Sequence, residues 1–378
     1  MKDKMLITQM GGVNGCKSRD CYVDIIKGWA ILLVVIGHID NTCVGHLYSW
    51  LLGSWKLAIF FMVAGFYMKD EKLCHPLAFL KGKVKSLYMP ALIIYGLAVL
   101  LHNVFITIGW YPADGVHPVT GAPVVVYGIK EIAIGLAKVF CCAGSGELVM
   151  GAMWFLYVLM YSMVGLAILY WILGKLVRDL ERRNMVMLIL LFVGAIASGI
   201  MTKKVGITIS RVNVTFTAMY LIWVGKMVQQ GFSVKYNHWG WFIVSILVIV
   251  QSILFMKVHQ NLAWNEYPDL MVMVVGGWAA IYVLGFIGKK IQFNFIGKFI
   301  ALMGCDSLYI MAFHILGFFI CNSMLRHAGF FEIDAAKGTY TYCCGNRVVA
   351  VLCYIVFGVA VPLVIMWGWR KVKGMINK

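Results

Sequence analysis

The chain has 378 residues, of which 62% are hydrophobic and only 13% are charged. A domain with a polar, water-facing surface cannot keep such a balance, so the composition excludes an ordinary soluble protein. Lysine and arginine outnumber aspartate and glutamate by 33 to 16, but no separate basic domain holds this excess, so the charge does not indicate nucleic-acid binding.

Apolar stretches of about 20 residues recur along the chain, long enough as helices to cross a ~30 Å hydrocarbon layer. They do not alternate as barrel strands would. In chain order we predict spans near 24–40, 48–68, 87–108, 151–173, 184–200, 212–229, 239–257, 269–287, 302–322 and 347–369. The expected fold is therefore all-α, a polytopic integral membrane bundle of about ten transmembrane helices.

These spans form one membrane domain, 24–369, between an N-terminal segment, 1–23, and a tail, 370–378. Lysine and arginine are concentrated in both terminal segments and in the loops on the same side, which predicts that both termini are cytoplasmic. Residues 1–20 are polar and lack an apolar stretch followed by a small-residue cleavage site, so we expect no removable signal peptide. Anionic lipid heads are the expected partners of the excess positive charge.

Two outer loops are predicted, near 109–150 and 323–346. The first begins with turn residues and then becomes apolar with helical spacing from about 124 to 142, which predicts a lid or a re-entrant helix. The second mixes charged and aromatic residues, which suits contact with a polar acceptor or an ordinary solvated loop. Its charged residues and histidine are Arg326, His327, Glu332, Asp334 and Lys337.

Cysteine spacing gives no zinc pattern, so no metal site is predicted. The adjacent pairs Cys141-Cys142 and Cys343-Cys344 fall in or near outer segments, where disulfides can form if the compartment is oxidising.

The first span carries two ionisable residues, Lys27 and His38, and Lys56 falls within the second. Eleven residues of helix bring Lys27 and His38 within about 20° of one face and roughly 16 Å apart. Lys27 then lies near the cytoplasmic surface, where it is either functional or a boundary lysine that extends to the surface. His38 lies deeper, as a packing residue or as a proton acceptor from a hydroxyl, and Gly37 leaves space beside it.

Two further groups of polar residues recur near span ends. Lys81, Lys83 and Lys85 precede the third span, either as anchors on the positive side or as a site for phosphates of an anionic cosubstrate. In the ninth span, Ser307 and His314 share one helical face, and His314 is either a satisfied packing residue or part of a polar cavity.

Five segments in order resemble the acyltransferase 3 family of bacterial membrane acyltransferases. Asp24 to His38 is similar to its first-helix pattern of a basic residue, ten residues and a histidine, with lysine in place of the more frequent arginine. Segment 60–66 resembles Phe-Phe-x-x-Ser-Gly-Phe, and segment 83–90 resembles the basic pair before the third helix, with Ser86 at the usual second arginine. Trp154-Phe155-Leu156 and the segment from Ser307 to His314 resemble two later signatures.

The resemblance implies transfer of an acyl group, usually acetyl, from cytoplasmic acyl-coenzyme A to a hydroxyl of a cell-envelope glycan or related acceptor, in a bacterial plasma membrane. It implies that Lys81, Lys83, Lys85 and Lys27 hold the nucleotide of the cosubstrate, and that His38 is the general base, with Lys27 and His314 in the catalytic group. Trp154, Ser307 and Asp24 are expected to line the substrate pocket. No permanently bound cofactor is expected, and the oligomeric state is not predicted.

A membrane transporter or permease for a glycan or a small polar solute is the alternative function. Polar residues within spans and an outer lid suit a transporter equally well, although no clear internal repeat is found.

Overall fold

The computed structural model describes residues 21–39, 55–111, 115–116, 123–141, 146–206, 211–232, 234–254, 262–267, 269–329, 341 and 347–376. Its elements are α2 (Cys21–Ile36), α5 (Lys56–Phe66), α6 (Asp70–Leu73), α7 (Pro76–Lys83), η2 (Val84–Tyr88), α8 (Met89–Leu100), α9 (His102–Thr107), α10 (Ile129–Phe140), η3 (Leu148–Met150) and α11 (Trp154–Leu176). They continue with α12 (Leu180–Ile200), η4 (Met201–Val205), α13 (Val212–Phe232), α14 (Trp239–Leu254), η5 (Leu262–Trp264), α15 (Leu270–Ile291), α16 (Phe295–Cys305), α17 (Ser307–His327) and α18 (Arg347–Ile376).

Six helical stretches in this described part are long and apolar enough to cross a membrane. They are Pro76–Leu100, Trp154–Leu176, Leu180–Val205, Leu270–Ile291, Ser307–His327 and Arg347–Met375. Shorter apolar helices include α5, α14 and α16. The prediction of an all-α, polytopic membrane protein is therefore confirmed, while the count of about ten spans and the cytoplasmic placement of the termini remain predictions.

Two predicted spans, 87–108 and 302–322, are wrong as single helices. The first is interrupted at Leu101, between α8 and α9, and the second at Asp306, between α16 and α17. The chain turns at Asp306, whose N–H closes the last turn of α16 onto Leu302 and whose carbonyl oxygen accepts the first bonds of α17. The side chain of Asp306 pairs with Arg370 near the end of α18. An aspartate at this point ends one helix and begins the next because its charge is held by an arginine from another span.

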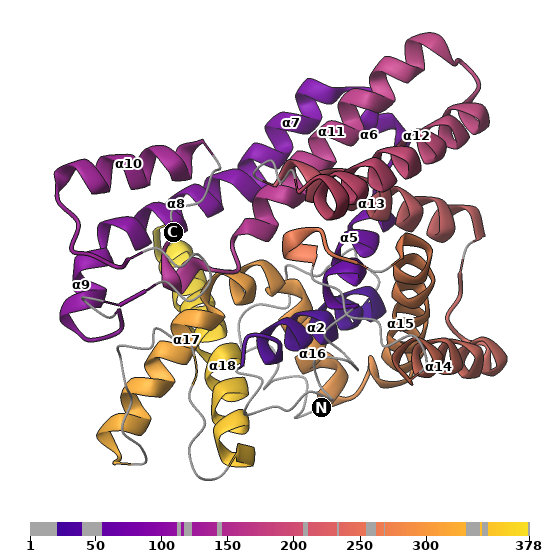
Figure 1. Ribbon diagram of the computed structural model, residues 1–378. Coiled ribbons are helices and arrows are strands. Elements are labelled where there is room, and N and C mark those ends of the chain that lie inside the picture. The colour runs from indigo at the N-terminus through magenta and orange to yellow at the C-terminus, as the bar shows by residue number, and fades with distance from the viewer. Residues whose placement is uncertain are drawn as a thin grey trace.

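Helix α2 lies at the centre of the bundle, surrounded by α5, α15, α16, α17 and α18 (Figure 1). Its apolar residues are buried around most of its circumference. At its crossing with α16, the backbone of Gly28 approaches the carbonyl of Ile300, and Gly304 approaches the carbonyl of Asp24. This close contact fixes the depth of the first helix and of the residues that follow it.

Helices α5 and α13 cross through a reciprocal pair of glycines. A Cβ at Gly65 would overlap the carbonyl oxygen of Ile222, and one at Gly225 would overlap the carbonyl oxygen of Met62. Small residues allow helix backbones in a membrane to approach closely, so that van der Waals contact holds them together. The glycine in segment 60–66 is therefore required by the packing of α5.

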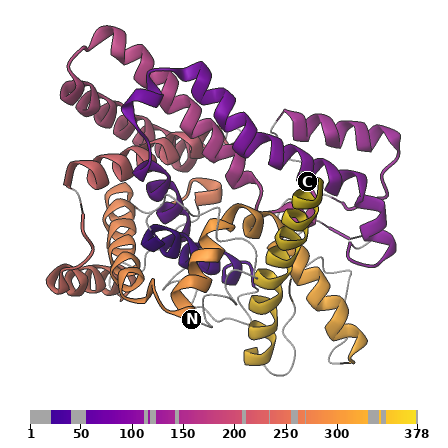
Figure 2. The same cartoon turned by 180° about the vertical axis from the view of Figure 1, so that it is seen from behind.

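An elongated layer flanks this centre, made by the continuous helix α7, η2 and α8 together with α11 and α10 (Figures 1 and 2). The predicted helix within 124–142 is confirmed as α10. Gly128 begins it with a backbone N–H that donates to the Glu131 carboxylate at 2.9 Å. It packs along α8, and the Tyr88 hydroxyl donates to the carbonyl of Phe140 at 2.6 Å. Helix α10 therefore packs along the side of the span that contains α8 and does not project from the bundle.

The crossing of α5 and α13 predicts a matched difference between two glycine substitutions. We expect Gly65→Ala to lower the unfolding temperature in detergent, because overpacking against backbone typically costs about 1–3 kcal/mol. Gly368→Ala, in α18, meets no atom within 4 Å and should leave stability equal or slightly higher. Equal unfolding temperatures for the two variants would contradict the reciprocal glycine contact.

Candidate functional site

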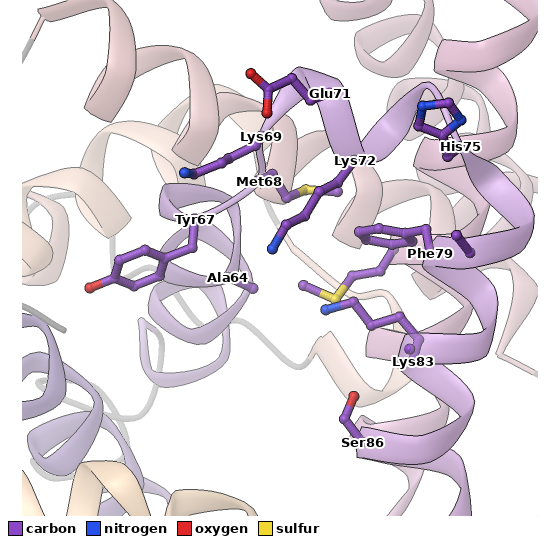
Figure 3. A pocket seen from close by; sticks show the side chains of 13 residues that line it. Ala64, Tyr67, Met68, Lys69, Glu71, Lys72, His75, Phe79, Lys83 and Ser86 are labelled. Carbon is purple, nitrogen blue, oxygen red and sulfur yellow. The ribbon is translucent and has the colours of Figure 1, made fainter. Parts of the chain in front are cut away.

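A cavity of about 560 Å³ lies at the face predicted to be cytoplasmic. The end of α5, the chain from α6 to η2 and one residue of α11 form its walls (Figure 3). Its lining residues are Ala64, Tyr67, Met68, Lys69, Glu71, Lys72, His75, Ala78, Phe79, Gly82, Lys83, Ser86 and Met163. Segments on either side of the second inter-span loop therefore meet around one hollow.

The lining of this cavity is basic and partly aromatic. Lys69, Lys72 and Lys83 contribute three ammonium groups against the single carboxylate of Glu71. Their side chains extend toward the space between α5 and α7 (Figure 3). The Lys83 ammonium also lies 5.0 Å from the centre of the Phe79 ring. Ammonium groups serve as point cations for phosphate, so the cavity suits an anionic, phosphorylated ligand.

Of the four lysines predicted to hold the cosubstrate, only Lys83 lines this cavity. Lys81 and Lys85 are exposed outside it, and Lys27 lies in α2. The chain from Val84 to Tyr88 is a π-helix, which widens the turn and shifts the direction of successive side chains. Lys83 and Ser86 face the cavity together with His75, Phe79 and Gly82, which are spaced as on one face of a helix. Ser86 occupies the position where the family usually has arginine.

Lys69 and Lys72 were missed by the sequence reasoning, which counted them only as positive-side anchors. They lie on the short turn that contains α6, and this turn is anchored by its own ion pair. The Lys226 ammonium, from α13, lies 2.9 Å from the Asp70 carboxylate, and the Lys226 side chain is 2% exposed. The close sequence spacing of Lys69 and Lys72 at the end of α5 was the available signal.

Deeper in the bundle, the structure brings the two predicted histidines together. His38 lies in the turn that follows α2, and His314 lies in α17. Their ring centres are 4.8 Å apart in an edge-to-face arrangement. Two segments that are almost 280 residues apart in sequence therefore place the two histidines in direct ring contact.

The proton positions of both imidazoles follow from their hydrogen bonds. Nδ1 of His38 lies 2.9 Å from the carbonyl oxygen of Val34, and Nδ1 of His314 lies 2.9 Å from that of Ile310. Carbonyl oxygens only accept, so each Nδ1 carries a proton and donates it. In the neutral ring, Nε2 then has a lone pair. Nε2 of His314 is buried and has no hydrogen-bond partner among the described residues.

Lys56, the first residue of α5, lies beside this pair. Its ammonium occupies the space next to Gly37, where a Cβ would overlap the Nζ atom. It is also close enough to act electrostatically on both His38 and His314. The space that Gly37 was expected to leave is thus filled by a cation from the neighbouring span.

The remaining predicted site residues lie apart from the histidine pair or in other contacts. Lys27 lies 2.5 Å from the Asp24 carboxylate, which is 1% exposed, and neither residue lines the basic cavity. Ser307 begins α17, about 10 Å along the helix from His314. Trp154 begins α11, with the Arg211 guanidinium 5.0 Å from its ring centre.

A second buried charged cluster, which the sequence reasoning missed, holds the 109–150 segment. Nδ1 of His102 lies 3.0 Å from the Glu147 carboxylate, and Nε2 lies 3.0 Å from the carbonyl of Val125. The carbonyl of Val125 only accepts, so Nε2 carries a proton, and with Glu147 ionised Nδ1 carries one too, which makes the pair an imidazolium with a carboxylate. The ring of Tyr127 stacks on that of His102 with centres 3.4 Å apart.

The hydroxyl of Tyr111 completes this cluster. It accepts a hydrogen bond from the backbone N–H of Val149 at 3.1 Å. Burial, followed by the nearby charge of Glu147, raises the pKa of this hydroxyl well above its usual value. Tyr111 therefore stays protonated and remains a donor at all physiological pH values.

Several sequence expectations fall on other parts of the chain. Cys141 is a free, exposed thiol, whereas Cys142, Cys343 and Cys344 lie outside the described residues, as does most of loop 323–346. No group of three potential metal ligands occurs among the residues that the structure describes.

The His102 and Glu147 pair predicts a stability difference between two glutamate substitutions. Glu147→Gln leaves a buried imidazolium without its counter-charge, and breaking such a pair typically costs about 3–5 kcal/mol in the free energy of unfolding. Glu131→Gln, in the exposed cap of α10, should cost less than about 1 kcal/mol. Unfolding in detergent by denaturant measures both; a similar small loss for both variants would refute the charged pair.

Comparison with known sequences gives one family match. Residues 21–367 match the profile of a family described as an acyltransferase domain, which covers nearly the whole chain. No curated protein and no solved structure matches the chain.

Proposed function

This chain belongs to the acyltransferase 3 family, and on that premise we propose that it transfers an acyl group, acetyl in the simplest case, from cytoplasmic acyl-coenzyme A to a hydroxyl of a cell-envelope glycan or related acceptor. Membership supports a multi-pass membrane acyltransferase; the donor, the acceptor, the catalytic base and the bacterial plasma membrane are parts of the proposal. The observation that carries it is the contact between the half-buried His38 and the buried His314, with proton-accepting Nε2 atoms.

The basic cavity is the proposed site for the nucleotide of acyl-coenzyme A. Its lysines offer cations to the phosphates, and Tyr67 and Phe79 offer flat surfaces for a base. Helix α5 joins this cavity to the histidine pair, because Ala64 lies at the cavity and Lys56 lies at the other end. Eight residues of helix separate them by about 12 Å, a span suited to the long arm that carries the thioester.

At the reactive end, His38 is the proposed general base. Its Nε2 takes the proton of the acceptor hydroxyl, whose oxygen attacks the thioester carbonyl carbon. The carbon–sulfur bond then breaks, and the departing thiolate takes the proton back from His38. His314 lies against His38 and shapes the site, and no covalent acyl-enzyme forms in this scheme.

Lysine substitutions test the donor site. Lys83→Gln and Lys72→Gln should each raise the Kd of coenzyme A about tenfold or more, because a charge-assisted hydrogen bond is worth about 1.5–3 kcal/mol. Lys81→Gln and Lys85→Gln, outside the cavity, should change it less than about twofold. Calorimetry on the purified protein measures all four, and equal effects at the two sets of lysines would exclude the cavity as the site.

A histidine substitution tests the base. His38→Ala should lower kcat for acyl transfer by about 10²–10⁴-fold while coenzyme A still binds, since that is the usual contribution of general-base catalysis. His327→Ala is a matched control, because His327 makes the same bond to the carbonyl four residues earlier but is exposed at the end of α17. Near-normal turnover by a folded His38→Ala protein would remove His38 from this role.

The same assay separates the enzyme from a transporter. An acyltransferase in detergent releases coenzyme A from acetyl-coenzyme A when an acceptor is added, whereas a transporter needs two compartments to show activity.

A further inference from the structure

Among the described residues, no counter-ion contacts the ammonium of Lys56. This lysine is partly buried at the start of α5, and among the described residues no carboxylate oxygen lies within ion-pair distance of its ammonium. The half-buried Lys27 and the buried Lys226, in contrast, each contact an aspartate. An ammonium inside a membrane bundle is unfavourable unless it is paired or has a function.

The position of Lys56 is set by residues that also set the histidines. Its ammonium lies against Gly37, the residue directly before His38, and no Cβ fits between them. Trp55, which precedes Lys56, is 2% exposed and packs against Gly276 of α15. The start of α5 is therefore held in place, and the ammonium is directed toward the turn that carries His38.

Among the described residues, the groups that face this centre are neutral or positive. Helix α2 and its turn supply His38, α17 supplies His314 and Phe318, and α5 supplies Lys56. The buried Nε2 of His314 has no partner among the described residues. The site thus contains a base, a second imidazole and a positive charge, and lacks a described negative group that would satisfy that charge.

The proposed reaction creates such a negative group. When the acceptor oxygen bonds to the thioester carbon, the pair of electrons of the C=O double bond moves onto the carbonyl oxygen. The acceptor proton moves to Nε2 of His38, which leaves a tetrahedral intermediate with one oxyanion. The carbonyl then re-forms, the carbon–sulfur bond breaks, and the thiolate takes the proton from His38. A fixed cation near the oxyanion lowers the barrier because charge develops only during the reaction.

We infer that the Lys56 ammonium is a catalytic group that stabilises this oxyanion beside His38, an inference that rests on the proposed acyl transfer. Gly37 has the associated role of leaving space for the ammonium. The lysine is suited to this role because none of its described neighbours carries a negative charge, so its interaction is strongest with the oxyanion of the transition state.

Substitutions of Lys56 and Gly37 test the inference in the full-length purified protein. The assay follows label from acetyl-coenzyme A into the envelope fraction of source cells that lack this chain. Lys56→Met keeps the length and apolar body of the side chain and should lower kcat about 10²–10³-fold, with the KM and the Kd for coenzyme A little changed. Lys56→Arg keeps the charge and should recover part of this loss.

Gly37→Ala provides a second variant, because it displaces the ammonium without removing the charge. It should lower kcat with unchanged coenzyme A binding, whereas the double variant with Lys56→Met should be no slower than Lys56→Met alone. Lys175→Met is the control: this ammonium lies 3.6 Å from the centre of the Trp171 ring on α11 and should leave kcat unchanged.

The outcomes separate this inference from the proposed function. A wild-type protein that transfers no acetyl group would overturn the proposed function and the role of Lys56 with it. An active wild type whose folded Lys56→Met variant keeps kcat within about threefold would overturn the role of Lys56 alone. A loss confined to KM would also overturn it, because it would make Lys56 a binding residue for substrate. Loss of kcat with partial recovery in Lys56→Arg supports the inference.

Discussion

A charged or polar group inside a membrane bundle needs a partner, and this constraint organises the structure. Asp24 holds Lys27, Asp70 holds Lys226, Asp306 holds Arg370, and Glu147 holds His102. The first pair lies within α2, and the other three connect helices or fix turns. The centre formed by His38, His314 and Lys56 differs because, among the described residues, its ammonium has no counter-ion. Its incomplete pairing is what distinguishes it from the structural clusters.

The fold positions this centre through α2 and α5. The glycine contacts between α2 and α16 fix the position of α2 in the bundle. Those between α5 and α13 fix the position of α5. At one end of α5 lies a basic cavity, and at the other Lys56 lies beside the turn that carries His38. The arrangement suits a cosubstrate with a phosphorylated head at the membrane surface and a reactive thioester deeper inside. Function in this account follows from where two helix crossings place a few polar atoms.

The apolar helices could be predicted from the sequence, because long apolar runs depend on local helix geometry, but α2 ends at Ile36, before His38. The break at Asp306 could not, since its aspartate is accommodated by Arg370 from another span. Which lysines face the cavity depends on how α7 and η2 pack against α11, and this tertiary contact cannot be derived from the spacing of the lysines alone. The contact of Lys56 with Gly37 and the pairing of His102 with Glu147 are tertiary, so residue type alone gave no sign of them.

The most direct test is an experimental structure of the full-length protein with coenzyme A bound. The account predicts that the phosphates contact Lys72 and Lys83 in the basic cavity, that the arm follows α5, and that the thiol lies within hydrogen-bond reach of Nε2 of His38. A nucleotide bound away from this cavity, or a thiol that ends far from His38, would contradict the account.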